Sequence, residues 1–339
     1  MVRQGIIILI LFLGLIGSPA NSKSPPPGTG TADVPANILI MLDNSGRMSA
    51  RVRSGSALYY PSDVQTDSSG NMYVLEYSYN RIKKYDANGN YVRSFGGYSY
   101  GCTGWTYAYD FQIYNDQIYI YGIYDRSIRI LDLNGGCIKQ SRRYIFVRDR
   151  YNRIQRIDRG SLKNLGTQSF SSSYLYYGFG LNANNAGTKL IAPNAYYYNT
   201  GLSEFNINSS GNLTFSRQTC RSYSTSNGCF RYSFGADYDS NGNVYGVDRN
   251  YMRLQKFNSN LSYQRKTGSY YNRSGPFLFP WGVHVDKSDK IYVADYSNSA
   301  IRIYDTNLNL QKSIGGSAGT RLDVSKEVIK KIVSNTDLT

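Results

Sequence analysis

A seven-residue phrase recurs six times in this chain, and its spacing limits the folds that the chain can adopt. The copies are NRIKKYD (80–86), RSIRILD (126–132), NRIQRID (152–158), TGLSEFN (200–206), MRLQKFN (252–258) and SAIRIYD (299–305). Their central aliphatic residues are 46, 26, 48, 52 and 47 positions apart. Five copies fit a unit of about 40–50 residues, the size of a four-stranded propeller blade. The copy at 152–158 comes early, which predicts a blade that is short or lacks a strand.

The sequence around the phrase predicts strands joined by Gly/Asn turns. A turn and a strand precede it at 67–74, 239–245 and 286–293, and another turn and strand follow it at 86–96. The 34 Tyr and 33 Gly residues suit such strands and turns. Within the first phrase, alternation predicts that Ile82 and Tyr85 are buried. By the same pattern we expect the side chains of Arg81, Lys83 and Lys84 to be exposed.

These repeats resemble the NHL repeat family of β-propellers. The resemblance implies an all-β fold, a six-bladed NHL-type propeller over residues 58–316. Circular closure would remove exposed sheet edges, which suits a chain whose sequence offers no helices to cover them.

The N-terminus predicts export. Arg3 precedes an unbroken apolar run from Ile6 to Ile16, and small residues follow at Ser18 and Ala20. This is the pattern of a secretory signal peptide over residues 1–20, and the run is short for a membrane span. Residues 21–35 are rich in Pro, Gly, Ser and Thr and indicate a flexible linker. We therefore expect an extracellular or cell-surface protein with no membrane span in its mature chain, crossing the periplasm if its host is Gram-negative.

Export makes the four cysteines candidates for disulfides. Four cysteines allow three pairings. We favour Cys220 with Cys229, which would close a hairpin-like loop at its base, and Cys102 with Cys137 for the remaining pair.

The segments flanking the repeats resemble the first strand and first helix of a von Willebrand factor A domain. Residues 36–50 contain an apolar strand that ends in Asp43-Asn-Ser45, and residues 320–339 carry a helical apolar stripe. In that family a DxSxS loop binds a divalent cation, which implies an incomplete site for Mg²⁺ made of Asp43, Ser45 and Ser49. We interpret the propeller as inserted between these two elements, with the rest of the A domain absent from the chain or supplied by another. The combination resembles surface adhesins and type IV pilus tip proteins of the PilY/PilC kind.

A second cation motif lies inside the repeats. Asp237, Asp239, Asn241 and Asp248 match the positions of a Ca²⁺-binding loop, although the same residues also read as the ordinary turn of the repeat. Glu76, Asp248 and Asp295 recur at equivalent positions, as a calcium-dependent propeller lactonase or esterase would require. Repeat symmetry explains that recurrence equally well. The single histidine, His284, argues against zinc and Ser-His-Asp chemistry, and we expect its role to be structural.

The basic residues predict a binding surface. The chain has 38 Lys and Arg against 23 Asp and Glu, a formal net charge of +15. The expected surface gathers on the short third blade and consists of Arg142, Arg143, Arg148, Arg150, Arg153, Arg156, Tyr144 and Tyr151. Arg and Tyr together are typical of polyanion binding, although net charge alone speaks only to non-specific association.

We therefore expect a non-catalytic, exported interaction protein of the adhesion or pilus-tip type. Its expected partners are a protein, pilus components, or a polyanionic surface such as polysaccharide, lipopolysaccharide or extracellular DNA. Mg²⁺ or Ca²⁺ is the only cofactor that the sequence suggests. Two alternatives stay open, a calcium-dependent lactonase or esterase and a nucleic-acid-binding NHL propeller.

Overall fold

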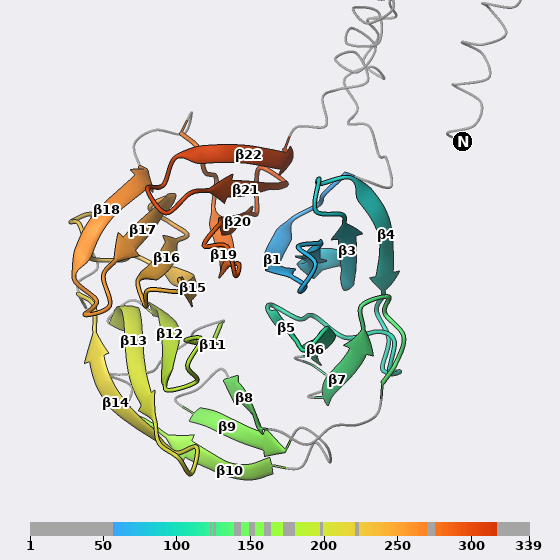
Figure 1. The fold of residues 1–339 in the computed structure, drawn as a ribbon, viewed down its shortest axis with the longest axis horizontal. Coiled ribbons are helices and arrows are strands. Elements are labelled where there is room, and N and C mark those ends of the chain that lie inside the picture. The colour runs from blue at the N-terminus through green and yellow to red at the C-terminus, as the bar shows by residue number, and fades with distance from the viewer. Residues whose placement is uncertain are drawn as a thin grey trace, which may run out of the picture.

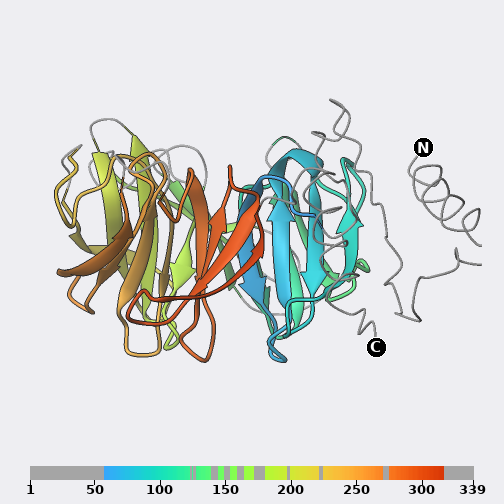
Figure 2. The same cartoon turned by 90° about the horizontal axis from the view of Figure 1, so that it is seen from above.

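Strands arranged as a ring of sheets make up the fold (Figure 1). The computed structural model describes residues 57–122, 124, 127–138, 144–148, 153–158, 164–171, 180–196, 199–220, 224–269 and 275–316. In these residues the strands form six antiparallel sheets, and the only helical segment is a 3₁₀ turn, Tyr77–Tyr79. Figure 2 shows the ring from its side, with the strands running between its two faces. The all-β propeller architecture expected from the repeats is confirmed.

Four of the sheets have four strands each, ordered from the ring axis outward as they follow in the chain. The first contains β1 (Pro61–Thr66), β2 (Met72–Glu76), β3 (Arg81–Tyr85) and β4 (Tyr91–Gly96). The next contains β11 (Asn182–Ala183), β12 (Lys189–Tyr196), β13 (Asn199–Ile207) and β14 (Leu213–Gln218). The last two contain β15 (Ser233–Tyr238), β16 (Val244–Asp248), β17 (Arg253–Phe257) and β18 (Tyr263–Gly268), then β19 (Pro280–Val285), β20 (Ile291–Asp295), β21 (Ala300–Tyr304) and β22 (Leu310–Gly315).

Two sheets have three strands each in the described residues. One contains β5 (Phe111–Tyr114), β6 (Gln117–Gly122) and β7 (Ser127–Asp132). The other contains β8 (Tyr144–Arg148), β9 (Arg153–Asp158) and β10 (Asn164–Ser169). The second of these holds the early copy of the phrase, whose spacing predicts a short blade.

The core lies between neighbouring sheets. Second strands such as β2, β16 and β20 are buried along their whole length, because a sheet packs on each of their faces. Outer strands such as β4 and β22 are largely exposed. The recurring phrase forms the third strand, where Ile82 and Tyr85 are buried as predicted.

One expectation for this strand is wrong. Lys83 is buried, with 1% of its surface exposed, and not exposed as alternation suggests. Its ammonium lies 3.5 Å from the Glu76 carboxylate and donates to the carbonyl of Ala57. Because partners for its charge lie inside the sheet packing, this lysine can occupy a core position.

Aspartates stabilise the turns between first and second strands. Asp67 Oδ1 accepts hydrogen bonds from the backbone N–H groups of Ser69 and Asn71 (3.0 and 2.9 Å). Its Oδ2 accepts from the Asn71 side chain (2.8 Å) and from the Tyr73 hydroxyl (3.1 Å). The turn at Asp239 repeats the same four contacts, ending on the Tyr245 hydroxyl. Some of the tyrosines therefore stabilise the turns of the repeat.

The ring closes between sheets that share no strand. Residues from the first and last sheets pack into one apolar cluster, in which Leu58 and Val64 meet Ile301 and Ile314. The close approach needs glycine, because a Cβ at Gly282 would lie 2.6 Å from the Ser62 carbonyl. Since Leu58 and Ile314 are in this same cluster, the described chain begins and ends at one place on the ring.

The flanking segments lie outside the described residues. These are the signal peptide expected over 1–20, the linker expected over 21–35, the segment 36–50 with Asp43, Ser45 and Ser49, and the helix expected over 320–339. Among the residues that are described, no helix is long and apolar enough to cross a membrane.

Candidate ligand-binding face

The two faces of the ring differ in the residues that they carry. The Asp-containing turns lie on one face. The opposite face, here called the connector face, carries the loops between second and third strands and the connections between sheets. Aromatic residues gather in these loops and at the nearby ends of the inner strands: Tyr59, Tyr60, Tyr77, Tyr79, Tyr98, Tyr100, Tyr107, Tyr109, Tyr124, Phe234, Phe279, Trp281 and Tyr296.

The central rings of this set pack on one another, some nearly parallel and some tilted, and are here called the aromatic stack. It consists of Tyr60, Tyr77, Tyr109, Trp281 and Tyr296. Trp281 is nearly buried at its centre, 4.6 Å from Tyr296 and 5.8 Å from Tyr109 between ring centres. Tyr77 and Tyr109 are parallel within 6° at 4.8 Å, and Tyr60 follows Tyr296 at 5.0 Å.

Several rings on this face are open to solvent. The exposed fraction is 45% for Tyr60, 47% for Tyr79, 59% for Tyr98 and 70% for both Tyr100 and Tyr124. Large exposed apolar patches on soluble proteins commonly mark binding sites. Tyrosine is suited to such sites because it combines a flat apolar ring with a hydroxyl and has few rotatable bonds.

A cation borders the aromatic stack. The Cζ of Arg249 lies 5.0, 5.4 and 5.5 Å from the ring centres of Phe279, Phe234 and Trp281. Its Nη1 donates to Asn250 Oδ1 at 3.1 Å, and its Nε is buried without an acceptor. Burial lowers the pKa of Arg249, while Tyr296 opposes that effect. No carboxylate of the described residues forms an ion pair with Arg249.

Two basic residues next to these loops are ion-paired within their own sheets. Arg81 pairs with Glu76, and Arg302 Nε donates to Asp295 Oδ2 at 2.8 Å. The carboxylates are fully buried in their sheets. Glu76, Asp248 and Asp295, considered above for a channel-bound calcium, are therefore not brought together, because each holds the loop of a different sheet.

Asp248 shows this role most fully. It accepts hydrogen bonds from the backbone N–H groups of Arg231, Tyr232 and Tyr251 at 3.0 to 3.2 Å, and Arg253 Nη2 lies 3.4 Å away. Burial raises the pKa of Asp248, and Arg253 and the N–H donors counter this effect.

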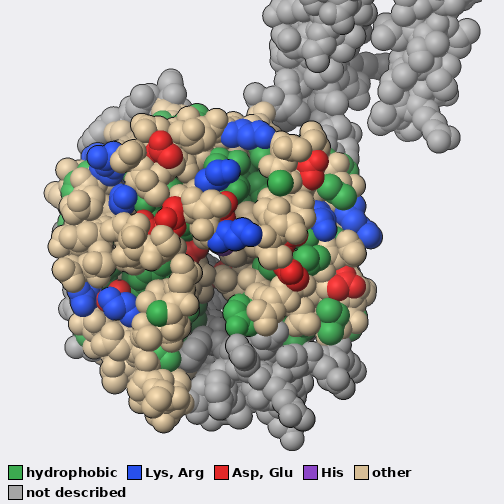
Figure 3. Space-filling model, viewed as in Figure 1, with side chains coloured by type: hydrophobic (Ala, Val, Ile, Leu, Met, Phe, Trp, Pro, Cys, Tyr) green, Lys and Arg blue, Asp and Glu red, His purple; other side chains and the backbone are tan. Residues whose placement is uncertain are grey.

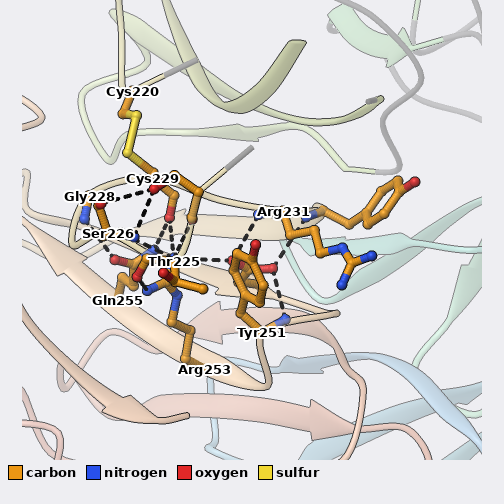
Figure 4. Close-up of polar contacts among 12 residues, drawn as sticks. Cys220, Thr225, Ser226, Gly228, Cys229, Arg231, Tyr251, Arg253 and Gln255 are labelled. Carbon is orange, nitrogen blue, oxygen red and sulfur yellow. Dashed lines mark hydrogen bonds and ion pairs between the residues drawn. A yellow bond between two sulfur atoms is a disulfide. The ribbon is translucent and has the colours of Figure 1, made fainter. Parts of the chain in front are cut away.

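The loop between β14 and β15 is fastened to the same cluster. Arg253 donates to the carbonyls of Thr225 (2.7 Å) and Cys229 (2.6 Å), as Figure 4 shows. A disulfide joins Cys220 to Cys229, with 4.7 Å between Cα atoms. A second disulfide joins Cys102 to Cys137 at 5.8 Å. Both pairings favoured from the sequence are confirmed.

Two carboxyls, buried Asp63 and partly buried Asp110, lie at the axis beneath the aromatic stack. Asp63 in β1 and Asp110 just before β5 share a hydrogen bond, and Asp63 Oδ2 also accepts from Phe111 N at 3.2 Å. Burial raises the pKa of Asp110 to about 6. Burial and the neighbouring Asp110 raise the pKa of Asp63 well above its usual range. With Tyr109 and Trp281 they line a cavity of about 20 Å³, which is room for one water molecule.

A series of hydrogen bonds continues around the axis from one sheet to the next. Gln112 Nε2 on β5 donates to Asn182 Oδ1 on β11 at 2.7 Å. Asn182 Nδ2 donates in turn to the Ala236 carbonyl on β15 at 2.8 Å. These contacts satisfy edge groups of inner strands that have a paired neighbour on one side only.

His284 completes this series at the ring closure. Its Nδ1 lies 3.2 Å from Asp237 Oδ2 on β15, and its Nε2 lies 2.9 Å from Thr66 Oγ1 on β1. Asp237 Oδ2 also accepts from Val285 N at 2.8 Å. The histidine thus connects the last sheet to both of its neighbours, a role that agrees with the structural one expected from the sequence.

The residues of the expected calcium loop lie in different places and have different hydrogen-bond partners. Asp237 faces His284 at the axis, Asp239 holds its turn, and Asp248 lies at the other end of β16. Asn241 donates its backbone N–H to Asp239. Throughout the described ranges, no group of three or more His, Cys, Asp and Glu residues is placed to hold a metal ion.

The expected basic surface on the third sheet lies mostly outside the described residues. Arg142, Arg143, Arg150 and Tyr151 fall in undescribed segments, and Tyr144, Arg148 and Arg156 are placed only as members of β8 and β9. Arg153, at the start of β9, is exposed. Figure 3 shows acidic and basic side chains interspersed on the face in view, with a hollow at the ring axis.

Sequence reasoning missed the connector face and Arg249. The aromatic residues fall in irregular loops, so no periodic pattern reveals that they meet. The available signal was the density of Tyr in 98–109, between two predicted strands. No pattern in the sequence reveals that Arg249 lacks a carboxylate beside it.

Comparisons with known proteins support the fold. Residues 277–304 match the family described as NHL repeat. A streptogramin B lyase structure superposes with a TM-score of 0.52 at 11% identity, over 78% of this chain and 85% of that one. A catalytically inactive variant of virginiamycin B lyase from Staphylococcus aureus, with quinupristin, gives 0.50 at 11% identity, over 78% and 87%. No curated protein matches the sequence. The chain is a β-propeller that carries an NHL repeat at residues 277–304 and resembles these lyases in fold alone.

Proposed function

We propose that this protein is an exported surface-interaction protein of the adhesion or pilus-tip type, which binds a surface polymer through its connector face without catalysis. The observation that carries the proposal is the aromatic surface around the axis, with five tyrosines between 45% and 70% exposed. Such rings offer flat faces on which the apolar faces of sugar rings can stack. Exposed aromatic side chains are also the residues most often dominant in binding energy.

The axis itself supports binding over chemistry. The cavity beneath the aromatic stack has room for one water molecule and not for a substrate. The recurring acidic residues that a calcium-dependent hydrolase would use are ion-paired inside separate sheets. A ligand is therefore recognised on the connector face and not within the ring.

Two features support export. The N-terminal sequence has the pattern of a signal peptide. All four cysteines form disulfides in the structure, as in proteins of oxidising compartments. We propose that the protein acts at the cell surface or outside the cell.

The position of the chain ends supports insertion of the propeller into another domain. Leu58 and Ile314 belong to one apolar cluster, so the two ends of the described propeller lie close together. A propeller can then interrupt the loop of a host domain without separating its strands. We propose that this host is the von Willebrand factor A-like element suggested by residues 36–50 and 320–339.

The first prediction tests the connector face with two tyrosines of equal exposure. Tyr60→Ala should lower retention on immobilised alginate roughly 5- to 10-fold, because one stacking ring is lost. Tyr114→Ala is the matched control, since Tyr114 is 47% exposed but lies on the opposite face, at the end of β5. Surface plasmon resonance at fixed salt measures both. Equal loss in the two variants, or wild-type protein that does not bind, would refute the proposed function.

A further inference from the structure

We propose that Arg249 forms a subsite for the carboxylate of an acidic sugar, so that the polymer bound on the connector face is a polyuronate. This inference rests on the function proposed above and specifies its ligand. It follows from three properties of the site: a fixed guanidinium without an anionic partner, a run of aromatic rings leading away from it, and the pairing of Arg81, Arg253 and Arg302 with carboxylates.

The guanidinium is held in position by aromatic rings. Phe279, Phe234 and Trp281 all lie within 5.5 Å of its Cζ. Stacking fixes the plane of an arginine and leaves its edge available for two parallel hydrogen bonds to a carboxylate. Because the side chain is already ordered, little conformational entropy is lost when an anion binds.

The charge of Arg249 is not compensated within the described protein. Its hydrogen bond to Asn250 supplies a neutral acceptor, and Nε has none. Partial burial of a cation costs desolvation free energy, and a bound anion would offset that cost. Arg81, Arg253 and Arg302 show the usual solution in this fold, which is a carboxylate from the same sheet.

The rings beside Arg249 indicate a ring-shaped, weakly charged ligand. From Trp281, next to Arg249, the stack continues to Tyr296 at 4.6 Å and to exposed Tyr60 at a further 5.0 Å. The exposed ring of Tyr60 can stack on one sugar, while the carboxylate of another sugar reaches the guanidinium.

A nucleic acid fits this environment less well. Its backbone carries a charge at every residue and is bound by several unpaired cations. Here Arg81 and Arg302 are neutralised by Glu76 and Asp295. A polymer with one carboxylate per sugar needs fewer unpaired cations than a nucleic acid does.

The test compares an oligouronate with its uncharged counterpart. Tetragalacturonate and the tetrasaccharide obtained by reducing its carboxyl groups are titrated into the full-length protein by calorimetry. Arg249→Gln should weaken tetragalacturonate binding about 10- to 100-fold, the effect of losing charge-assisted hydrogen bonds. Binding of the reduced sugar should stay unchanged. Arg265→Gln removes the same charge from the exposed strand β18 and should change neither affinity.

A second variant separates binding from folding. Arg249→Lys retains the charge but not the planar pair of donors, so it should lower the preference for the acidic sugar by a smaller factor. Thermal unfolding of each variant shows whether the fold is kept. If Arg249→Gln unfolds, the Arg249→Lys result alone decides.

Three outcomes overturn the inference, and one bears on the proposed function instead. Preference for the acidic sugar that survives both Arg249 variants would show that the carboxylate binds elsewhere. Equal loss in Arg265→Gln would show non-specific charge attraction. Single-stranded DNA that displaces tetragalacturonate at lower concentration would identify a nucleic acid as the ligand. Wild-type protein that binds neither sugar, nor immobilised alginate, would refute the proposed function itself.

Discussion

Asp110 illustrates how a single carboxyl can couple the stability of the fold to pH. It lies against Asp63 at the axis, where burial raises its pKa to about 6. The two side chains share a hydrogen bond, which requires a proton on the pair. Such an arrangement favours the protonated form in the folded state over the unfolded state.

Stability should therefore fall as the pH rises through this region. The pKa of Asp110 is higher in the folded chain than the usual 3.8, so its stabilising effect is complete below about pH 4 and is lost through pH 6. In the wild type, Asp110 should make the unfolding free energy fall by roughly 1–3 kcal/mol as the pH rises through this region. Asp110→Asn should abolish that fall. Urea unfolding at pH 4, 5, 6 and 7 measures it.

The surface variant Asp116→Asn serves as the control and should keep the wild-type pH dependence. If Asp110→Asn also loses stability between pH 4 and 6 as the wild type does, Asp110 is not the group responsible.

The roles of some residues can be predicted from the sequence and those of others cannot, for a physical reason. The turn aspartates, such as Asp67, act on neighbours within six positions and therefore appear as a local motif. Lys83 and Arg249 depend on groups that the fold brings from other strands and loops. Local patterns say nothing of such partners, so Lys83 was misassigned and Arg249 overlooked.

At the scale of elements, the loops of the connector face are stabilised by two kinds of cross-link. Arg253 and Gln255 hold the 220–229 loop through its carbonyls, in addition to its disulfide. The other disulfide joins the β4–β5 connection to the segment after β7. The two disulfides span 9 and 35 residues in sequence.

Removing the disulfides should therefore have unequal effects. The chain-entropy estimate gives about 3 kcal/mol for the Cys220–Cys229 loop and about 4 kcal/mol for the Cys102–Cys137 loop. Cys220→Ser with Cys229→Ser should lose less stability than Cys102→Ser with Cys137→Ser, since Arg253 still holds the shorter loop. Guanidinium unfolding of the two double variants checks the order, and a reversed order would contradict it.

The elements themselves follow closely from the repeats. Third strands coincide with the recurring phrase at 81–85, 253–257 and 300–304. The long and irregular connections between sheets were not predictable, because their conformation depends on Arg253, Asp248 and the disulfides and not on local periodicity.

At the scale of the whole molecule, closure of the ring relies on side chains. First and last sheets share no strand in the described residues, and apolar packing around Leu58 and Ile301 joins them. His284 adds the polar contact, between Thr66 and Asp237. An architecture closed in this way was expected from the repeats, but its closing contacts were not.

Loss of His284 should accordingly weaken the closed ring. His284→Ala removes the imidazole partner of the Thr66 hydroxyl and leaves the Asp237 carboxylate with backbone donors only, which should lower the unfolding free energy by about 1–3 kcal/mol. Lys312→Ala is the control, because its contact with the Asn88 carbonyl crosses the same boundary at the solvent-exposed surface. Thermal unfolding compares them. An effect of Lys312→Ala as large as that of His284→Ala would show that the polar contact at the axis is unimportant.

The meeting of Leu58 and Ile314 in one cluster has a consequence for any domain that the propeller interrupts. An unfolded insert of this length would impose the closure entropy of a very long loop on its host. Once folded, the insert presents two adjacent ends and imposes only the entropy of a short one. The difference is roughly 3 kcal/mol in the host's favour, so the propeller and its host would fold cooperatively although they share no core.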